Sequence, residues 1–153
     1  MAGEICDDGN QSDLDKCKGD CSGTVSGWIC TGGSTTSASS CTELCGNGII
    51  TSSEQCDDGS ASDGNGCSST CTVESGWTCT GQPSTCTTTC GDGKKVGAEI
   101  CDDGDLNSLV GCLGTCLGTA PGYVCSGGSS TTASTCTTAC GDGVKIGTEV
   151  CDD

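Results

Sequence analysis

Apolar residues in this sequence occur in short, separate groups and never in a long run. No segment spaces them three and four residues apart over several turns, so the pattern predicts no helix. Two apolar groups, Ile49-Ile50 and residues 144–146, each follow a glycine-rich turn, and the second alternates as a strand does. Gly, Ser and Thr fill much of the rest. We therefore expect a small, mostly irregular fold with short β-strands and turns.

A cysteine-centred sequence, Glu-x-Cys-Asp-Asp, recurs along the chain at offsets of 50, 45 and 50 residues. The cysteines concerned are Cys6, Cys56, Cys101 and Cys151. A period of this length is typical of tandem repeats. The modules are placed at residues 1–44, 45–89, 90–139 and 140–153, the first without its opening cysteine and the last only a beginning. The chain is thus expected to be a segment of a longer array, elongated because adjacent modules have almost no linker.

Each complete module has six cysteines, and the interval between the fifth and the sixth varies in length. It holds ten residues at 31–40, six at 80–85 and ten at 126–135. Length variation between two cysteines indicates a loop with fixed ends and an exposed tip. This predicts the disulfides Cys30–Cys41, Cys79–Cys86 and Cys125–Cys136. The other four cysteines of a module allow three connectivities, between which the sequence does not choose.

Composition makes cross-links necessary. The chain has 19 cysteines in 153 residues but only three aromatic residues, so a module has little to bury. A disulfide contributes about 2–4 kcal/mol to stability, and three in one module would supply roughly 6–12 kcal/mol. Such a density of disulfides persists in an oxidising compartment, which predicts an extracellular or cell-surface protein. The aromatic residues, Trp28, Trp77 and Tyr123, are interpreted as plugs packed on the disulfides, with ligand stacking as the alternative.

Charge and residue types narrow the function. The net charge is −16, which argues against nucleic acid and anionic membranes as partners. No stretch is apolar enough to insert into a membrane. The chain has no His and no Arg, and nothing is placed to activate its many hydroxyl groups, so we expect no enzyme. Zinc is disfavoured as well, because the cysteines outside the Cys-x3-Cys pairs stand alone and histidine is absent.

Calcium is the alternative interpretation of the acidic residues. Asp57, Asp58, Asp63 and Asn65 offer hard oxygen ligands in the second module. They do not follow the EF-hand spacing, and the third module keeps only part of the set. The competing interpretation is a set of turns in which aspartates accept backbone N–H bonds. No cofactor is therefore expected, with calcium kept as the open alternative.

Glycosylation is predicted from the hydroxyl-rich segments, since Ser and Thr together number 42. Asn10 begins an Asn-x-Ser sequon. Exposed loops closed by cysteines suit O-linked sugars, and an unmodified polar loop is the alternative. The O-linked candidates are Ser34, Thr35, Thr36, Thr87, Thr88, Thr89, Thr131 and Thr132.

The repeat resembles the myxococcus-type cysteine-rich repeat over essentially the whole chain. The motifs that carry the resemblance are Cys90-Gly91-Asp92-Gly93, then Gly97-Ala98-Glu99-Ile100-Cys101-Asp102-Asp103-Gly104, then Gly111-Cys112, and Gly-Trp-x-Cys at Trp28 and Trp77. The first module departs from the pattern, with Lys16 before Cys17. Such repeats occur in large secreted or surface proteins and are similar to cysteine-rich parts of mastigoneme-type proteins, which build hair-like filaments. The resemblance implies a structural extracellular role.

Two functions of different classes follow. The first is a structural protein, a disulfide-stapled array that forms or decorates a filament or surface coat by self-association and carries covalent glycans. The second is a module for calcium-assisted adhesion or carbohydrate binding. A flexible beaded spacer is the alternative to a self-associating array.

Overall fold

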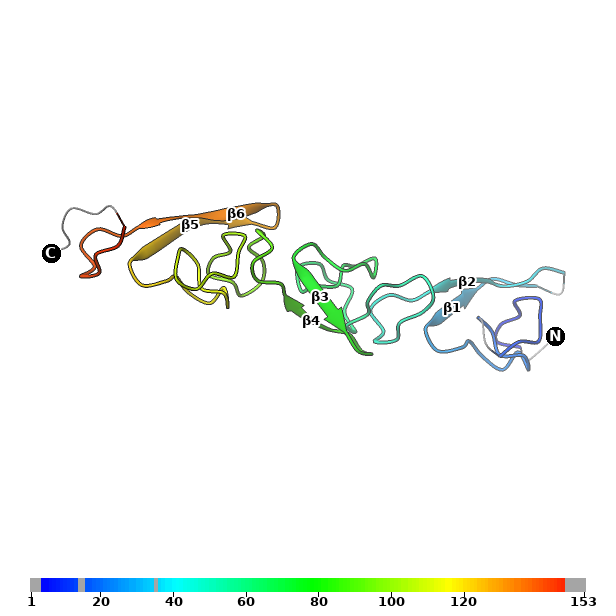
Figure 1. Ribbon diagram of the computed structural model, residues 1–153. Helices are drawn as coiled ribbons and strands as arrows, with labels where there is room; N and C mark the ends of the chain where they lie inside the picture. The colour runs from blue at the N-terminus through cyan, green and yellow to red at the C-terminus, as the bar shows by residue number, and fades with distance from the viewer. Residues whose placement is uncertain (1–3, 14–15, 35, 148–153) are drawn as a thin grey trace. The chain divides into compact units, whose positions relative to one another are not determined.

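The computed structural model describes residues 4–13, 16–34 and 36–147, and six short strands account for its regular structure. The strands form three separate antiparallel hairpins, one in each of the first three modules (Figure 1). Their bounds are β1 Trp28–Thr31, β2 Ser40–Glu43, β3 Trp77–Thr80, β4 Thr85–Thr88, β5 Tyr123–Ser129 and β6 Thr132–Thr138. These described ranges contain no helix, and hence none that could span a membrane.

Each hairpin is built around the fifth and sixth cysteines of its module. Cys30 lies directly opposite Cys41, and Cys125 opposite Cys136, with Cα atoms 4.0 Å apart in both bonded pairs. Cys79 and Cys86 are joined in the same way. The three pairs predicted from the variable interval are thus disulfide-bonded in the structure. The interval itself was expected to be a loop, yet β5 and β6 extend through most of residues 126–135, where Ser126 pairs with Thr135 and Gly127 with Ser134.

The strand expected at residues 144–146 is absent, and that prediction was wrong. Its alternating apolar side chains pack against another part of the chain instead of joining a sheet. A Cβ at Gly122 would collide with the side chain of Ile146 and come within 3.4 Å of Val144. Two apolar residues at alternating positions can form one short packing contact as readily as one face of a short strand, so the pattern alone does not distinguish the two.

The remaining cysteines follow a single connectivity, first to fourth and second to third. In the second module the bonds are Cys45–Cys71 and Cys56–Cys67, and in the third Cys90–Cys116 and Cys101–Cys112. The first module has Cys6–Cys17. Among the described residues, Cys21 and Cys140 are free thiols. Cys21 stands at the position of Cys71 and Cys116.

The buried interior consists mainly of sulfur. Within residues 4–13, 16–34 and 36–147, the buried apolar residues other than Ala120 are cysteines, while Ile5, Leu106 and Leu109 are exposed. The expected small disulfide-rich fold with short strands is therefore confirmed. Burial of large side chains contributes little, and covalent bonds and backbone hydrogen bonds hold the chain.

The chain divides into two compact units whose limits cross the modules. One contains Met1–Asp63, Cys67–Thr72 and Thr80–Thr85, and the other contains Gly64–Gly66, Val73–Cys79 and Cys86–Asp153. The end of one module and the start of the next thus lie in the same unit.

Candidate functional site

The first aspartate of Cys-Asp-Asp-Gly is the centre of each complete module. The side chain of Asp57 is fully buried. Its Oδ2 accepts backbone N–H bonds from Gly46 at 2.8 Å and Asn47 at 3.1 Å. Its Oδ1 accepts from Gly48 at 2.7 Å and Gly59 at 2.8 Å. Four donors from two segments therefore converge on one carboxylate, an arrangement called here the aspartate clamp.

The clamp keeps this buried carboxyl ionised. Burial alone would raise the pKa of Asp57, but the N–H groups of Gly59, Gly48, Asn47 and Gly46 together hold it below its ordinary value of 3.8. Hydrogen bonds to the charged form favour that form, so the donors outweigh desolvation.

The third module repeats the clamp on Asp102, which is also fully buried. Its carboxylate accepts from Gly91 at 2.8 Å, Gly93 at 3.0 Å and Gly104 at 2.9 Å. The Cys-Gly-Asx-Gly stretch that supplies most donors is called the opening segment, at residues 45–48, 90–93 and 140–143. Its first glycine has a φ of +86° at Gly46 and +82° at Gly91, a backbone conformation that favours glycine.

The second aspartate of the pair has a separate role. Oδ2 of Asp103 accepts the N–H of Cys112 at 2.7 Å, and Oδ2 of Asp8 accepts that of Cys17 at 3.2 Å. It therefore fixes the third cysteine of the module, next to the second-to-third disulfide. Two adjacent carboxylates thus hold two different backbone segments.

A serine two residues before the sixth cysteine completes the site, and sequence reasoning missed it. Ser84 and Ser134 are buried. The hydroxyl of Ser84 accepts a hydrogen bond from the backbone N–H of Asp57 at 3.0 Å. The backbone N–H of Ser84 in turn donates to the Asp57 carbonyl at 2.7 Å. Ser134 makes the same pair of bonds with Asp102, at 3.1 and 2.6 Å. Ser39, Ser84 and Ser134 all stand two residues before the sixth cysteine, and this constant spacing is the sequence signal that could have identified the serine.

The calcium candidates do not gather into one ligand set. The oxygens of Asp57 accept four N–H bonds, whereas Asp58 accepts from Ser60 at 2.9 Å and Asp63 from Ser69 at 2.7 Å. Asn65 is exposed. Within the described part of the chain, the groups of cysteines and acidic residues compact enough to share an ion are two, and neither contains these aspartates.

Those two groups are each a disulfide with one carboxylate beside it. They are Cys45 and Cys71 with Glu54, and Cys90 and Cys116 with Asp102. Cysteine binds a metal ion as the thiolate, whereas these four sulfurs are oxidised to disulfides. The oxidised protein therefore offers no thiolate ligand at either place.

The glycosylation candidates lie mostly at the surface. Thr88 and Thr89 are half-buried, and Thr35 lies outside the described residues. The exposed ones are Asn10, Ser34, Thr36, Thr87, Thr131 and Thr132. Ser34 and Thr36 share a hydroxyl contact of 3.3 Å on the first hairpin.

All three aromatic side chains are half-buried. The Trp77 ring packs at Gly66, where an added Cβ would meet Trp77 Cε3 at 2.8 Å and would also collide with Cys86. The ring therefore lies beside the hairpin disulfide, as the plug interpretation expects. Lys16 Nζ lies 5.8 Å from the ring centroid of Trp28.

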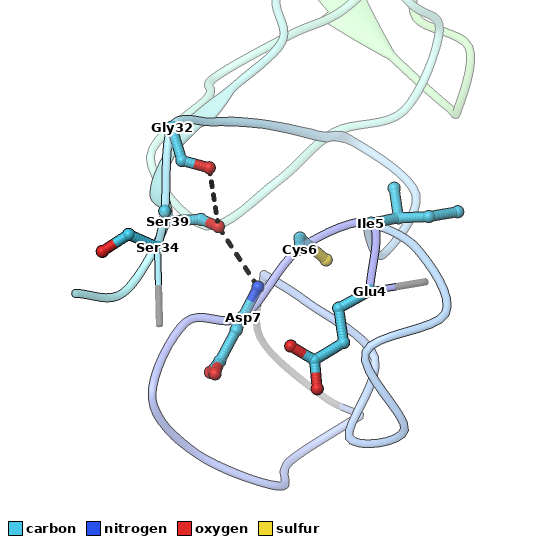
Figure 2. A pocket seen from close by; sticks show the side chains of 8 residues that line it. Glu4, Ile5, Cys6, Asp7, Gly32, Ser34 and Ser39 are labelled. Atoms are coloured by element: carbon cyan, nitrogen blue, oxygen red, sulfur yellow. Dashed lines mark hydrogen bonds between the residues drawn. The ribbon is translucent and has the colours of Figure 1, made fainter. Parts of the chain in front are cut away.

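The first module has an open version of the clamp. Asp7 is exposed, and its Oδ1 accepts the N–H of Gly9 at 2.8 Å. Beside it lies a cavity of about 240 Å³, lined by residues 4–7 and by Gly32, Gly33, Ser34 and Ser39, which lie between strands β1 and β2. Figure 2 shows Ser39 hydrogen-bonded to both Asp7 and Gly32 at its edge.

Comparison with protein families identifies the repeat. A family model described as a domain of unknown function (DUF4215) matches twice in tandem, at residues 28–72 and 73–117. The chain belongs to the DUF4215 family. The DUF4215 matches begin at or near the aromatic hairpin, whereas the modules above begin at the opening segment, and the boundaries at 45, 90 and 140 stay predictions. The chain has no significant match among curated proteins or solved structures.

Membership of a cysteine-rich tandem family, together with eight disulfides among the described residues, fits a secreted structural protein. The narrower resemblance to myxococcus-type or mastigoneme repeats stays a prediction.

Proposed function

We propose that this chain is a segment of an extracellular array that forms or decorates a filament or surface coat. One observation carries the proposal: the same packing contact joins the end of one module to the start of the next. A Cβ at Gly27 would meet Thr51 at 2.5 Å, and one at Gly76 would meet Val96 at 2.9 Å. The contact of Gly122 with Ile146 is the third instance.

The contact recurs at the glycine before each aromatic residue, so it has one register along the chain. At the second junction Trp77 also takes part, since a Cβ at Gly97 would lie 2.8 Å from its ring and 2.9 Å from Thr88. A junction that uses the same residues each time propagates by repetition, as in other repeat proteins. The exposed apolar and hydroxyl-rich side chains of such an array repeat as well, and many weak contacts between copies add by multivalency.

In this proposal the exposed Ser and Thr residues of the hairpins carry O-linked sugars. Thr131 at the tip of the third hairpin and Ser34 on the first are accessible candidates. Both ends of each hairpin are fixed by a disulfide, so sugars would project at regular intervals.

The proposal assigns the chain no catalytic activity, no resident metal, no nucleic acid partner and no membrane insertion. The absence of His and Arg and the net charge of −16 support the assignment. The buried carboxylates are occupied by backbone donors, which supports a structural use of the acidic residues over calcium binding.

Small-angle scattering of the chain over a range of concentrations tests the proposal, with imaging of native material beside it. We expect an extended particle whose apparent mass grows with concentration, and native mass above the polypeptide mass by whole sugar units. A compact monomer at all concentrations would contradict the array. A native mass equal to the bare chain would remove the glycans from it.

A further inference from the structure

A cavity of about 500 Å³ lies where the second module meets the third, entirely within the compact unit that contains Cys86–Asp153. Trp77 and Glu74 line it from the second module, and Lys95 lines it from the third. Ser130, in the turn between β5 and β6, lies at the same cavity. Small-molecule sites in proteins usually measure about 300–1,000 Å³, so the cavity has the size of such a site.

The Trp77 ring at this cavity is held in place by packing but is not enclosed. An added Cβ would lie 2.8 Å from its Cε3 at Gly66 and 2.8 Å from its Cη2 at Gly97. The side chain as a whole is half-buried. The ring therefore offers apolar surface in an orientation that is already fixed, so a ligand would not have to order it on binding.

The carboxylate of Glu74 is also fixed at the cavity, by backbone donors. Its Oε1 accepts the N–H of Gly64 at 2.8 Å, and its Oε2 accepts that of Gly66 at 2.7 Å. The Gly64 N–H also lies 2.9 Å from Oε2. A carboxylate can accept about four hydrogen bonds, so Oε1 keeps capacity for a ligand hydroxyl.

Three further polar groups at the cavity have no side-chain hydrogen bond or ion pair within the described part of the chain. They are the ammonium of Lys95 and the hydroxyls of Ser75 and Ser130. The base of the Lys95 side chain is nevertheless fixed, because its backbone N–H donates to the Ser129 carbonyl at 2.9 Å and an added Cβ at Gly128 would lie 3.0 Å from its Cβ. Donors and acceptors thus surround one aromatic ring.

The junction between the first and second modules has the same aromatic residue but an apolar lining. The corresponding pairs are Trp28 with Trp77, Val25 with Glu74, and Ile50 with Lys95. The correspondence holds in the backbone, since the Trp28 N–H donates to the Val25 carbonyl and the Trp77 N–H to the Glu74 carbonyl, both at 3.1 Å. Packing at such a junction therefore does not require the carboxylate or the ammonium, which leaves both for a ligand.

We propose that this cavity binds a neutral saccharide, a hexose or N-acetylhexosamine unit displayed by another molecule. A sugar ring has a C–H face that packs on an aromatic ring, and its hydroxyls both donate and accept hydrogen bonds. Trp77 takes the C–H face, Glu74 accepts from a hydroxyl, and Lys95 donates to a hydroxyl or acetyl oxygen. The net charge of −16 disfavours a polyanionic ligand. The site is independent of the proposed array, so either can fail without the other.

Titration of the chain, produced without glycosylation in an oxidising bacterial periplasm, with N-acetylgalactosamine and with glucose tests the site. A hexose has about 12 non-hydrogen atoms, so at ordinary ligand efficiency we expect a dissociation constant on the order of 1 mM for at least one of the two sugars. Saturation-transfer NMR on the unvaried chain measures it. In a Trp28→Phe chain Trp77 is the remaining tryptophan, and its fluorescence should change with the same constant.

Lys95→Ala should weaken binding by roughly tenfold, the change expected from one hydrogen bond to a charged group. Lys94→Ala is the matched control. It removes the same charge from the neighbouring residue, but Lys94 pairs with Asp92 at 3.9 Å and does not line the cavity. It should leave the dissociation constant unchanged, and thermal melting should show both variants folded.

Binding of neither sugar at roughly tenfold the expected constant, equal effects of the two lysine variants, or a fluorescence response that persists in Trp77→Phe would each overturn the inference. The chain from native material should bind with the same constant as the unglycosylated chain. Binding confined to the unglycosylated chain would show that a sugar attached to the chain itself, as on Ser130, fills the cavity, and would overturn an external ligand.

Discussion

The first and third modules have nearly the same sequence around Cys-Asp-Asp-Gly but differ in what surrounds the first aspartate. Asp102 is fully buried and bound by N–H groups of its opening segment, whereas Asp7 is exposed and bound by Gly9. The serine bond is present in both, through Ser134 and Ser39. The comparison teaches that the serine contact forms around an exposed aspartate as well as a buried one, and that the buried carboxylate is the one bound by N–H groups of an opening segment.

Reduction of the disulfides should have the largest effect on both modules, because the buried interior is cysteine. We expect reductant to abolish the protection of backbone amides from hydrogen exchange, and chelator to leave it unchanged. As reductant is raised, Cys6–Cys17 should open before Cys101–Cys112, since the open clamp leaves its surroundings less complete. Mass tagging of released thiols gives the order. Collapse in chelator alone, or simultaneous opening of both bonds, would contradict this picture.

Removal of the clamp carboxylate should have the next largest effect. Asp102→Ala should lower stability by about 3 kcal/mol or more, because it deletes a charged acceptor of three backbone N–H groups, each bond contributing roughly 1.5–3 kcal/mol. Asp7→Ala should cost less than about 1 kcal/mol, as expected for an exposed side chain. Thermal melting of each variant, at one fixed protein concentration, measures both.

Hydrogen exchange at Gly91 and Gly93 provides the residue-level control for the same pair of variants. Exchange there should accelerate in Asp102→Ala and stay unchanged in Asp7→Ala. Equal losses of stability in the two variants would show that burial of the carboxylate has little importance.

Much of this architecture could be predicted from the sequence, and the part that could not depends on backbone groups. The period and the Cys79–Cys86 type of pairing follow from cysteine spacing and from length variation. The role of Asp57 does not, because its donors are main-chain N–H groups of Gly46, Asn47 and Gly48, and every residue except proline has such a group. Calcium ligation and an Asx turn use the same aspartates, so composition left both open.

The serine contact and the junctions were missed for a related reason. Ser84 lies among many other Ser and Thr residues, so its residue type does not show that it is the buried one. The packing of Gly97 on Trp77 joins two modules, and no pattern within either module predicts it.

The junction between modules should be the next most sensitive place. Gly97→Ala should lower stability by about 1–3 kcal/mol. The backbone φ of +55° at this position disfavours alanine, and the new Cβ would lie 2.8 Å from the Trp77 ring. Gly23→Ala is the matched control, with open space around its Cβ. Tryptophan fluorescence and thermal melting should change in the first variant and not in the second. An unaffected Gly97→Ala chain would remove the junction as a stabilising contact.

The smallest effect should come from acid, since one carboxylate of the second module changes charge over a narrow range. Asp57 has a pKa lowered in the folded state, so its contribution is present above the ordinary value of 3.8 and is lost as pH falls through the folded pKa. Below that pH the protonated carboxyl no longer attracts its four N–H donors as an anion, and the clamp should loosen before any disulfide breaks. We expect the melting temperature to fall below about pH 4 in the unvaried chain and to fall less in Asp57→Asn, which has no charge to lose there. Because every disulfide persists in acid, refolding on return to neutral pH should be complete, and a melting temperature that depends on acid equally in both chains would assign the effect to other carboxylates.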